Sequence, residues 1–304
     1  MKQFNDITII GIDQGYGNMK TANTIFPTAI TAYDTAPMFK GDVLEYGGKF
    51  YRVGEGHKGF VADKSTDGDF YLLTLAAIAK ELEQYRLFTA SLCLSGGLPL
   101  SWVGSQRESF RQYLMQNETI RFRFNGNLFQ LRIVGCKVYP QGYAAIVQQL
   151  ADFEGEHLLA DIGNGTMNLL YLTDSQPQES RCWTEKIGVN QCMIRAKEAV
   201  LRRFGSKISD STVEQILRTG TAKIDADYLA CIREVASGYV AELFAALRSY
   251  EYDPATTHLT IVGGGGQLVK HFGSYDPEQV TIVDDICAAA KGYEYMAYRQ
   301  MLRG

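Results

Sequence analysis

The chain has 304 residues, of which 46% are hydrophobic and 21% charged, a balance that is ordinary for a globular protein and excludes wholesale disorder. This length exceeds the usual size of one hydrophobic core, so we expect two domains of about 150 residues each. With 30 Lys and Arg against 34 Asp and Glu, the formal net charge is −4, which excludes the strongly basic composition expected of a direct duplex-DNA binder.

The first informative segment is a buried strand that runs into a glycine-rich turn. Residues 7–12 are apolar apart from one threonine and one glycine, and Asp13 follows them directly. The turn and the lysine beyond it comprise Gly15, Tyr16, Gly17, Asn18 and Lys20. Glycines permit turns whose backbone N–H groups point at an anion, which predicts a phosphate-binding turn. We expect Asp13 to hold a hydrated Mg²⁺, which takes few carboxylates, and Lys20 to supply positive charge near the outer phosphates.

The segment after this turn is punctuated by proline and glycine. Its composition suits a surface loop or a small inserted subdomain at about residues 31–70. Gly47 and Gly48 separate two alternating stretches, which predicts a hairpin over residues 43–54. A stripe of apolar side chains then predicts a helix over residues 70–88.

Strands and helices alternate through the rest of the N-terminal half. The predicted elements are a strand from residue 91, a helix over 105–117, a hairpin over 119–131, a strand over 132–138 and a helix over 143–151. Asn125 and Gly126 are typical of a tight hairpin turn. The alternation of apolar and polar residues around this turn predicts that four side chains point inward, those of Phe122, Phe124, Phe129 and Leu131. Arg121 and Arg123 are read as a solvated strand face and not as a nucleic-acid stripe.

A second segment repeats the pattern of the first, a strand followed by an aspartate and a glycine turn. A short strand over residues 157–160 leads to Asp161, and a second glycine turn follows, with Gly163, Asn164, Gly165 and Thr166. A single aspartate followed by such a turn is more often an ordinary β-turn than a nucleotide site. Two copies in one chain favour phosphate binding, with Asp161 as the second carboxylate for Mg²⁺.

Helices are expected over about 191–204, 211–218 and 228–250, and a third glycine feature follows them. A strand over residues 259–262 runs into Gly263, Gly264, Gly265 and Gly266, and a helix begins beyond them. Four residues without side chains let a flat base or a diphosphate lie against the backbone near a helix N-terminus. A flexible linker is the alternative interpretation, but linkers are rarely bracketed by a buried strand and an apolar helix start.

Taken in order, these segments resemble the actin-like ATPase superfamily, which includes actin, chaperones and sugar kinases. The resemblance covers almost the whole chain, with two connecting segments at 138–145 and 285–293. It implies an α/β fold with two ribonuclease-H-like domains around an interdomain nucleotide cleft. The implied domains are residues 1–150, onto which a C-terminal helix at about 290–304 packs back, and residues 151–289.

Within the superfamily the sequence is most similar to the ParM/StbA plasmid-segregation branch. The glycine–tyrosine–glycine–asparagine motif that ends at Asn18 and is followed by Lys20 is typical of that branch. The resemblance implies an ATP hydrolase that uses ATP and Mg²⁺ and polymerises with itself into filaments. It also implies that an adaptor protein binds the plasmid DNA, so that the chain itself contacts no nucleic acid.

The resemblance also assigns roles to single residues. Asp13 and Asp161 would hold the hydrated Mg²⁺, while Gln141 would orient the water that attacks the terminal phosphate. Orientation suffices because phosphoryl transfer depends mainly on positioning and charge neutralisation. Glu214 is the candidate for the ribose contact. Asn164 stands where actins have an acidic residue, and Asn168 where many relatives have a second aspartate. Fewer carboxylates would weaken metal binding or slow hydrolysis, but loss of activity does not follow, because asparagine still orients water and accepts hydrogen bonds.

Several alternatives remain open. A small-molecule kinase of the same fold would need a catalytic carboxylate near the first connecting segment, where the chain has Gln141 and no carboxylate before Asp152. A chaperone would need a peptide-binding domain beyond residue 304. A radical-enzyme activator would need an iron–sulfur cluster. A structural protein in which the nucleotide only switches conformation also fits the motifs.

The six cysteines and four histidines form no metal-binding pattern. The cysteines are scattered singly at Cys93, Cys136, Cys182, Cys192, Cys231 and Cys287. Their spacing predicts reduced thiols in a cytoplasmic protein, and His57 and the other histidines show no zinc-ligand spacing. No segment has the length and apolarity of a membrane span or a signal peptide, so we expect no membrane association.

Overall fold

The computed structural model describes residues 1–38, 41–55 and 67–303. The inserted subdomain predicted at 31–70 is therefore described only in part, and His57 lies outside the described residues. The chain divides into two compact units. Unit 1 comprises Met1–Gln148 and Cys287–Gly304, and unit 2 comprises Gln149–Ile286.

Unit 1 is built on a mixed sheet that has ten strands in the described part of the chain, in the order β4-β3-β2-β8-β10-β9-β6-β7-β5, with β1 paired to β2. The strands are β1 (Lys2–Phe4), β2 (Ile7–Gln14), β3 (Asn18–Lys20), β4 (Ile25–Pro27), β5 (Ile30–Tyr33), β6 (Val43–Tyr46), β7 (Lys49–Val53), β8 (Thr89–Leu98), β9 (Thr119–Phe124) and β10 (Asn127–Pro140). The helices are α1 (Gly68–Glu83), α2 (Leu100–Leu114), α3 (Tyr143–Ile146) and α8 (Ala288–Arg303). The three central strands β2, β8 and β10 run parallel.

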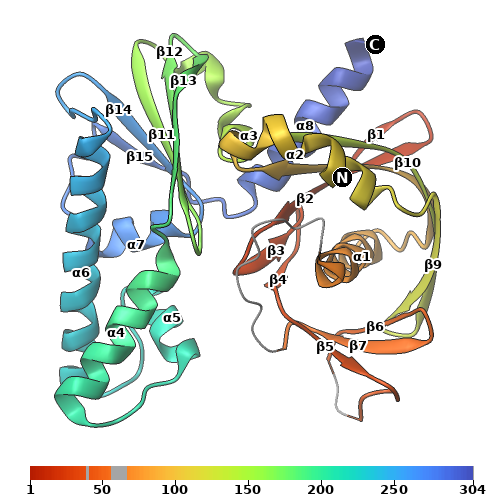
Figure 1. Cartoon of the computed structure of the whole chain (residues 1–304), viewed down its shortest axis with the longest axis horizontal. Coiled ribbons are helices and arrows are strands. Elements are labelled where there is room, and N and C mark those ends of the chain that lie inside the picture. The colour runs from red at the N-terminus through yellow and green to blue at the C-terminus, as the bar shows by residue number, and fades with distance from the viewer. Residues whose placement is uncertain (39–40, 56–66, 304) are drawn as a thin grey trace. The chain divides into compact units, whose positions relative to one another are not determined.

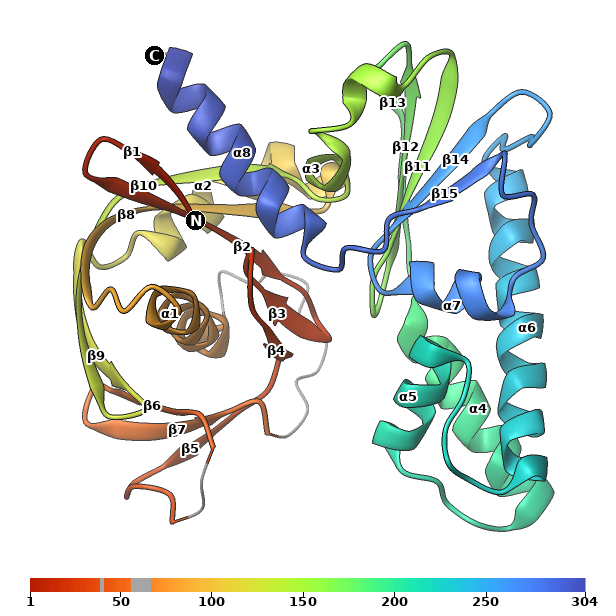
Figure 2. The ribbon, with the colours of Figure 1, turned by 180° about the vertical axis from the view of Figure 1, so that it is seen from behind.

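Strands β2 and β8 of unit 1 are buried on both faces, and successive side chains of a strand point to opposite sides. Ile10 and Leu94 belong to the core that includes the buried stripe of α1, which lies inside the curve of the sheet (Figure 1). Ile9 and Cys93 pack with Ala297 on the other face, where α8 runs along β1 and β2 (Figure 2). Burial on both faces explains why these strands read as nearly continuous apolar runs.

Unit 2 has a five-stranded sheet in the order β13-β12-β11-β14-β15, together with four α-helices in the described residues. The strands are β11 (Glu156–Ile162), β12 (Met167–Thr173), β13 (Gln176–Glu185), β14 (His258–Val262) and β15 (Val280–Ile282). The helices are α4 (Val189–Phe204), α5 (Asp210–Thr219), α6 (Ala226–Ser249) and α7 (Gly265–Phe272), after a 3₁₀ turn at Leu150–Asp152. Alternate residues of β11 and β14 pack into one core with all four helices.

Both predicted hairpins of unit 1 are confirmed, together with their turn residues. Gly47 and Gly48 adopt φ angles of 60° and 76°, and Asn125 and Gly126 adopt 50° and 83°. Two consecutive positive φ angles are what a tight two-residue hairpin turn requires. The side chains predicted to point inward, Phe122, Phe124, Phe129 and Leu131, are all buried.

Several predicted boundaries are wrong. Helix α1 ends at Glu83 and not at residue 88, because the chain turns out of the helix and Arg86 takes a φ of 53°. Helix α2 starts at Leu100, directly after Pro99, and not at 105. The helix expected over 143–151 stops at Ile146, so the segment after Gln141 makes only about one turn. The stretch expected to be a surface loop or a small subdomain begins with β5, which pairs with β7 and extends the sheet.

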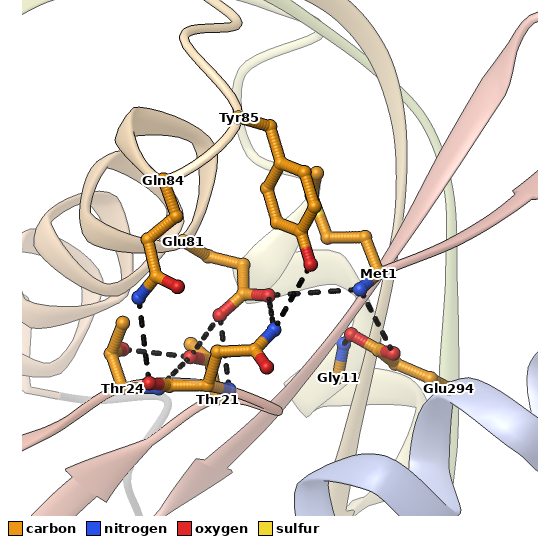
Figure 3. Close-up of polar contacts among 9 residues, drawn as sticks. Met1, Gly11, Thr21, Thr24, Glu81, Gln84, Tyr85 and Glu294 are labelled. Atoms are coloured by element: carbon orange, nitrogen blue, oxygen red, sulfur yellow. Dashed lines mark hydrogen bonds and ion pairs between the residues drawn. The ribbon is translucent and has the colours of Figure 1, made fainter.

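Two buried carboxylates in unit 1 hold a polar cluster together (Figure 3). Glu81 of α1 is fully buried and accepts hydrogen bonds from the Thr21 hydroxyl at 2.5 Å and from the Asn23 side-chain amide at 2.6 Å. Glu294 of α8 accepts the Gly11 backbone N–H at 3.2 Å. The Met1 ammonium lies 3.7 Å from an oxygen of each carboxylate. The cluster ties the loop after β3 to α1 and ties β2 to α8.

This burial predicts a pH dependence of stability. Desolvation raises the pKa of Glu294 from 4.5 to about 7, against the opposing effects of the Met1 ammonium and the Gly11 N–H. The folded state therefore binds more protons than the unfolded state between these values. We expect the free energy of unfolding to fall by up to about 3 kcal/mol as the pH rises through this window. Urea denaturation from about pH 5 to about pH 8 measures this fall. Glu294→Gln should remove it, and identical pH profiles for the two proteins would contradict the assignment.

Among the residues that the structure describes, no helix combines the length and the apolar character needed to cross a bilayer.

Candidate functional site

Unit 1 places Asp13 and Gln141 at the same edge of its sheet. Asp13 is the penultimate residue of β2, which lies beside the parallel strand β8. Leu98, the last residue of β8, is opposite Pro140, the last residue of β10, and Gln141 follows directly. Both side chains therefore lie where parallel strands end, which is the edge at which open α/β sheets bind ligands.

The first glycine turn, residues 15–17, joins β2 to β3 and is tightly packed. A Cβ atom at Gly15 would lie 2.7 Å from the Asn18 carbonyl oxygen, so only glycine fits there. The Tyr16 ring meets Phe70 edge-on, with 6.1 Å between the ring centroids. The Gln14 side-chain amide donates to the Thr74 hydroxyl at 2.5 Å. Side chains of α1 thus fix the position of this turn.

Thr28 holds the first glycine turn from the other side. Its hydroxyl donates to the Gly15 carbonyl at 2.6 Å, and its backbone N–H donates to the Gly17 carbonyl at 3.0 Å. The side chain is buried, with 3% of its surface exposed. Two of the three carbonyl groups of the turn are therefore bound by one residue.

Lys20 forms an ion pair with Asp13. The two residues are opposite each other on β2 and β3, and the Lys20 Nζ lies 2.8 Å from the Asp13 Oδ2. Both side chains are largely buried, with 16% and 12% exposed. The pair puts a positive charge beside the carboxylate at this edge, so a phosphate group and a hydrated cation would both find a partner here.

Gln141 is held by the end of β8. Its backbone N–H donates to the Leu98 carbonyl at 2.8 Å, and its side-chain Nε2 donates to the Gly97 carbonyl at 3.3 Å. An amide that donates through its nitrogen presents its oxygen as an acceptor, which is the group needed to orient a water molecule. The side chain is half-buried.

Unit 2 repeats this arrangement at the edge where β11 and β14 end. Asp161 of β11 is opposite Val262, the last residue of β14. Gly263 follows with a φ of 84°, and a Cβ atom there would lie 2.8 Å from the Asp161 Oδ1. The second aspartate and the tetraglycine segment are therefore direct neighbours within this unit.

The second glycine turn, residues 163–165, is held by the start of α4. The Gly163 and Asn164 carbonyls accept the backbone N–H groups of Val189 and Asn190 at 3.1 and 2.9 Å. A Cβ atom at Gly188 would lie 2.5 Å from the Asn164 carbonyl oxygen, so this approach requires glycine. The start of α4 therefore binds carbonyl groups of the second turn, as Thr28 binds those of the first.

Close packing explains two of the four glycines in the tetraglycine segment. A Cβ atom at Gly265 would lie 2.2 Å from the Ile162 side chain, and one at Gly266 would lie 3.0 Å from that of Ile282. Gly264 is exposed, and a Cβ atom there would meet nothing within 4 Å. Close packing of α7 on the sheet thus accounts for Gly265 and Gly266, whereas Gly264 leaves bare backbone at the surface.

The other predicted residues of unit 2 lie in different settings. Asn168 is opposite Asp161, and its Oδ1 accepts the Thr184 hydroxyl at 2.9 Å. Asn164 is exposed on the second turn. Glu214 is exposed on α5, a helix that packs against α7. The structure thus places Asn168 beside Asp161 and leaves Glu214 on a neighbouring helix.

Within the described ranges, no group of three or more His, Cys, Asp or Glu side chains is arranged to hold a metal ion. All six cysteines are described, and none is in a disulfide. Each unit instead supplies one aspartate at its sheet edge, which suits a hydrated Mg²⁺ because this ion needs only one or two carboxylates. A cavity of about 580 Å³ lies between α4 and α6 and is lined by none of the predicted site residues.

Sequence reasoning missed two residues on which the turns depend, namely Thr28, which binds the first turn, and Gly188, which lets the start of α4 approach the second. Thr28 ends an apolar stretch after β4, and Gly188 stands immediately before α4. Neither position carries a local signal for its partner, because the contacts join segments more than ten residues apart. Gly188 has extended backbone and so does not need glycine for a turn of positive φ, which leaves close approach of another segment as the reason for it.

The family model of the N-terminal domain of actin-like proteins matches residues 11–143. A comparison with curated protein sequences finds no match. The match covers both the first glycine turn and Gln141. Residues 11–143 are therefore similar to the N-terminal domain of actin-like proteins.

Solved structures show where the whole fold belongs. The archaeal actin homologue Ta0583 superposes with a TM-score of 0.75 at 19% identity, over 96% of this chain and 99% of that one. The ParM of Bacillus thuringiensis with ATP superposes at 0.71 and 12% identity, over 98% and 99%. The Alp12 filament structure superposes at 0.69 and 16% identity, over 97% and 99%. The chain has the two-domain α/β fold of actin-like proteins, as the sequence predicts.

Proposed function

We propose that this actin-like protein is an ATP hydrolase that assembles into nucleotide-dependent filaments in the cytoplasm. We further propose that these filaments segregate plasmid DNA through a DNA-binding adaptor protein, while the chain itself binds no DNA. One observation carries the enzymatic part of the proposal. Each unit ends a buried strand in an aspartate and a glycine turn whose carbonyl groups are bound by the protein, so that the N–H groups of the same peptides point to the opposite side, toward the proposed anion.

In this proposal the two compact units are the two domains, and both turns bind the phosphates of one nucleotide. Gly15, Tyr16, Gly17, Asn18 and Lys20 contribute from unit 1. The corresponding residues of unit 2 are Gly163, Asn164, Gly165 and Thr166, with the tetraglycine segment 263–266 on the adenosine side and Glu214 on the ribose. The exposed backbone at Gly264 supports the adenosine assignment.

Asp13 and Asp161 would hold the hydrated Mg²⁺, whose chemistry is to neutralise the charge that develops on the phosphates. Lys20 adds to this neutralisation from its place beside Asp13. Gln141 orients the attacking water through its side-chain oxygen. Because phosphoryl transfer needs positioning more than proton abstraction, an amide held by two hydrogen bonds to β8 is suited to this role.

The structural neighbours support the proposal at the level of the fold. The Bacillus thuringiensis ParM structure contains ATP, and Ta0583 has also been solved with ADP. Alp12 is a filament structure.

We expect the purified protein to pellet with ATP and Mg²⁺ and to stay in the supernatant with ADP. Light scattering should rise on addition of ATP and fall as the phosphate is released. The alternative is a small-molecule kinase of the same fold. Protein that stays monomeric at every concentration and transfers phosphate to an added sugar or vitamin would establish that alternative and overturn the filament proposal.

A further inference from the structure

Thr28 binds the first glycine turn in a way that backbone pairing alone does not explain. Its N–H bond to the Gly17 carbonyl continues the pairing of β3 with β4. Its hydroxyl makes a second contact at 2.6 Å, to the Gly15 carbonyl, which lies outside that pairing. The hydroxyl therefore adds a contact to the turn that the strand pairing does not provide.

These two bonds determine where the neighbouring N–H groups point. A trans peptide is planar, and its carbonyl and the following N–H point in opposite directions. The structure contains no cis peptide bond in its described residues. With the carbonyls of Gly15 and Gly17 fixed on Thr28, the N–H groups of Tyr16 and Asn18 are directed to the opposite side of the turn.

The second glycine turn shows the same orientation produced by different means. The Gly163 and Asn164 carbonyls are bound by the first N–H groups of α4. The N–H groups of Asn164 and Gly165 are therefore directed away from α4. Two unrelated partners, a threonine in unit 1 and a helix start in unit 2, bind turn carbonyls in the same way, which indicates that the resulting N–H orientation is what matters.

We propose that Thr28 is a positioning residue for the phosphates, which acts by turning the N–H groups of the first glycine turn toward the nucleotide. This inference rests on the proposed function, since it presumes that the turn binds phosphate. Without the hydroxyl the Gly15 peptide is free to rotate, and its carbonyl oxygen can then face the negatively charged ligand. The half-buried Gly15 carbonyl also loses its partner.

The test uses the full chain and compares ATP with adenosine, which has no phosphate. Thr28→Val removes the hydroxyl and keeps the shape, and Thr28→Ala removes it without a branched side chain if the valine variant does not fold. Thr28→Ser restores the hydroxyl. Thr31→Val is the matched control, because Thr31 lies exposed on the neighbouring β5 and its hydroxyl makes a long contact with the Glu55 carbonyl, at 3.4 Å, and none with the glycine turn as described.

Isothermal titration should show ATP affinity roughly ten-fold lower for Thr28→Val, with adenosine affinity unchanged. Thr28→Ser and Thr31→Val should bind ATP as the wild type does. Equal ATP affinity in Thr28→Val and the wild type would overturn the inference and leave the proposed function standing. Equal losses for ATP and adenosine would show a merely structural role and also overturn it. A wild-type protein that binds no ATP would overturn the proposed function itself.

Discussion

Replacing Asp161 by alanine is expected to lower phosphate release from ATP by roughly 100-fold or more. Asp161 is the carboxylate that unit 2 places at its sheet edge, directly against Gly263. In the proposed mechanism it holds the hydrated cation that neutralises the developing charge. Asp161→Asn keeps the shape and removes the charge, so it should lose nearly as much activity. Phosphate release under saturating ATP measures both effects.

In the same assay, Gln141→Ala distinguishes orientation of the attacking water from binding of the nucleotide. We expect slower phosphate release with nucleotide still bound, because Gln141 contacts water and not the nucleotide in the proposed mechanism. Asp152→Ala is the control, since Asp152 is an exposed carboxylate that follows Gln141 in the chain. Unchanged turnover in both Asp161→Ala and Gln141→Ala would refute the assigned roles. Loss of activity in Asp152→Ala would instead favour a catalytic carboxylate in that segment.

The parts of the fold that the sequence predicted well depend on local chemistry. Gly47 with Gly48, and Asn125 with Gly126, specify hairpin turns through φ angles that few other residues adopt. The strands before Asp13 and Asp161 are recognisable because burial on both faces demands a continuous apolar run. The site motifs were found for the same reason, since each joins a strand to a turn within a few residues.

The parts that the sequence did not predict depend on distant contacts. The Thr28 hydroxyl and the start of α4 reach their turns across segments that no local pattern links. The ion pair between Lys20 and Asp13 follows from the register of β2 and β3, which residue spacing alone did not reveal. The packing of α3 against the distant helix α8 is another contact that no local pattern predicts.

The glycines show both what the sequence reveals and what it does not. Turn glycines are legible from their neighbours, whereas the glycines that let segments approach each other are not. A Cβ atom at Gly11 would lie 2.0 Å from the Ala290 carbonyl oxygen, and one at Gly292 would lie 1.7 Å from that of Ala144. Both contacts bring α8 against parts of unit 1 that lie far from it in the chain. Such positions should be intolerant of any side chain.

Gly292→Ala is therefore expected to destabilise the protein by about 3 kcal/mol, a large value for the addition of one methyl group. Gly292 is buried in α8, and the atom that blocks its Cβ belongs to the backbone of α3, which cannot move as a flexible side chain would. The matched control is Gly238→Ala in α6. Gly238 is an exposed helical glycine with nothing within 4 Å of its Cβ position, so alanine should stabilise the protein by about 0.5–1 kcal/mol.

The same substitution in two helices should thus act with opposite sign. Urea denaturation followed by circular dichroism gives both changes in the free energy of unfolding. Helix propensity alone would make both variants more stable, so a stabilised Gly292→Ala protein would show that α8 does not pack closely on α3. Because α8 also carries Glu294, whose carboxylate accepts the Gly11 N–H of β2, displacement of α8 should disturb the strand that ends in the first glycine turn. Gly292→Ala should therefore weaken ATP binding as well, whereas Gly238→Ala should leave it unchanged.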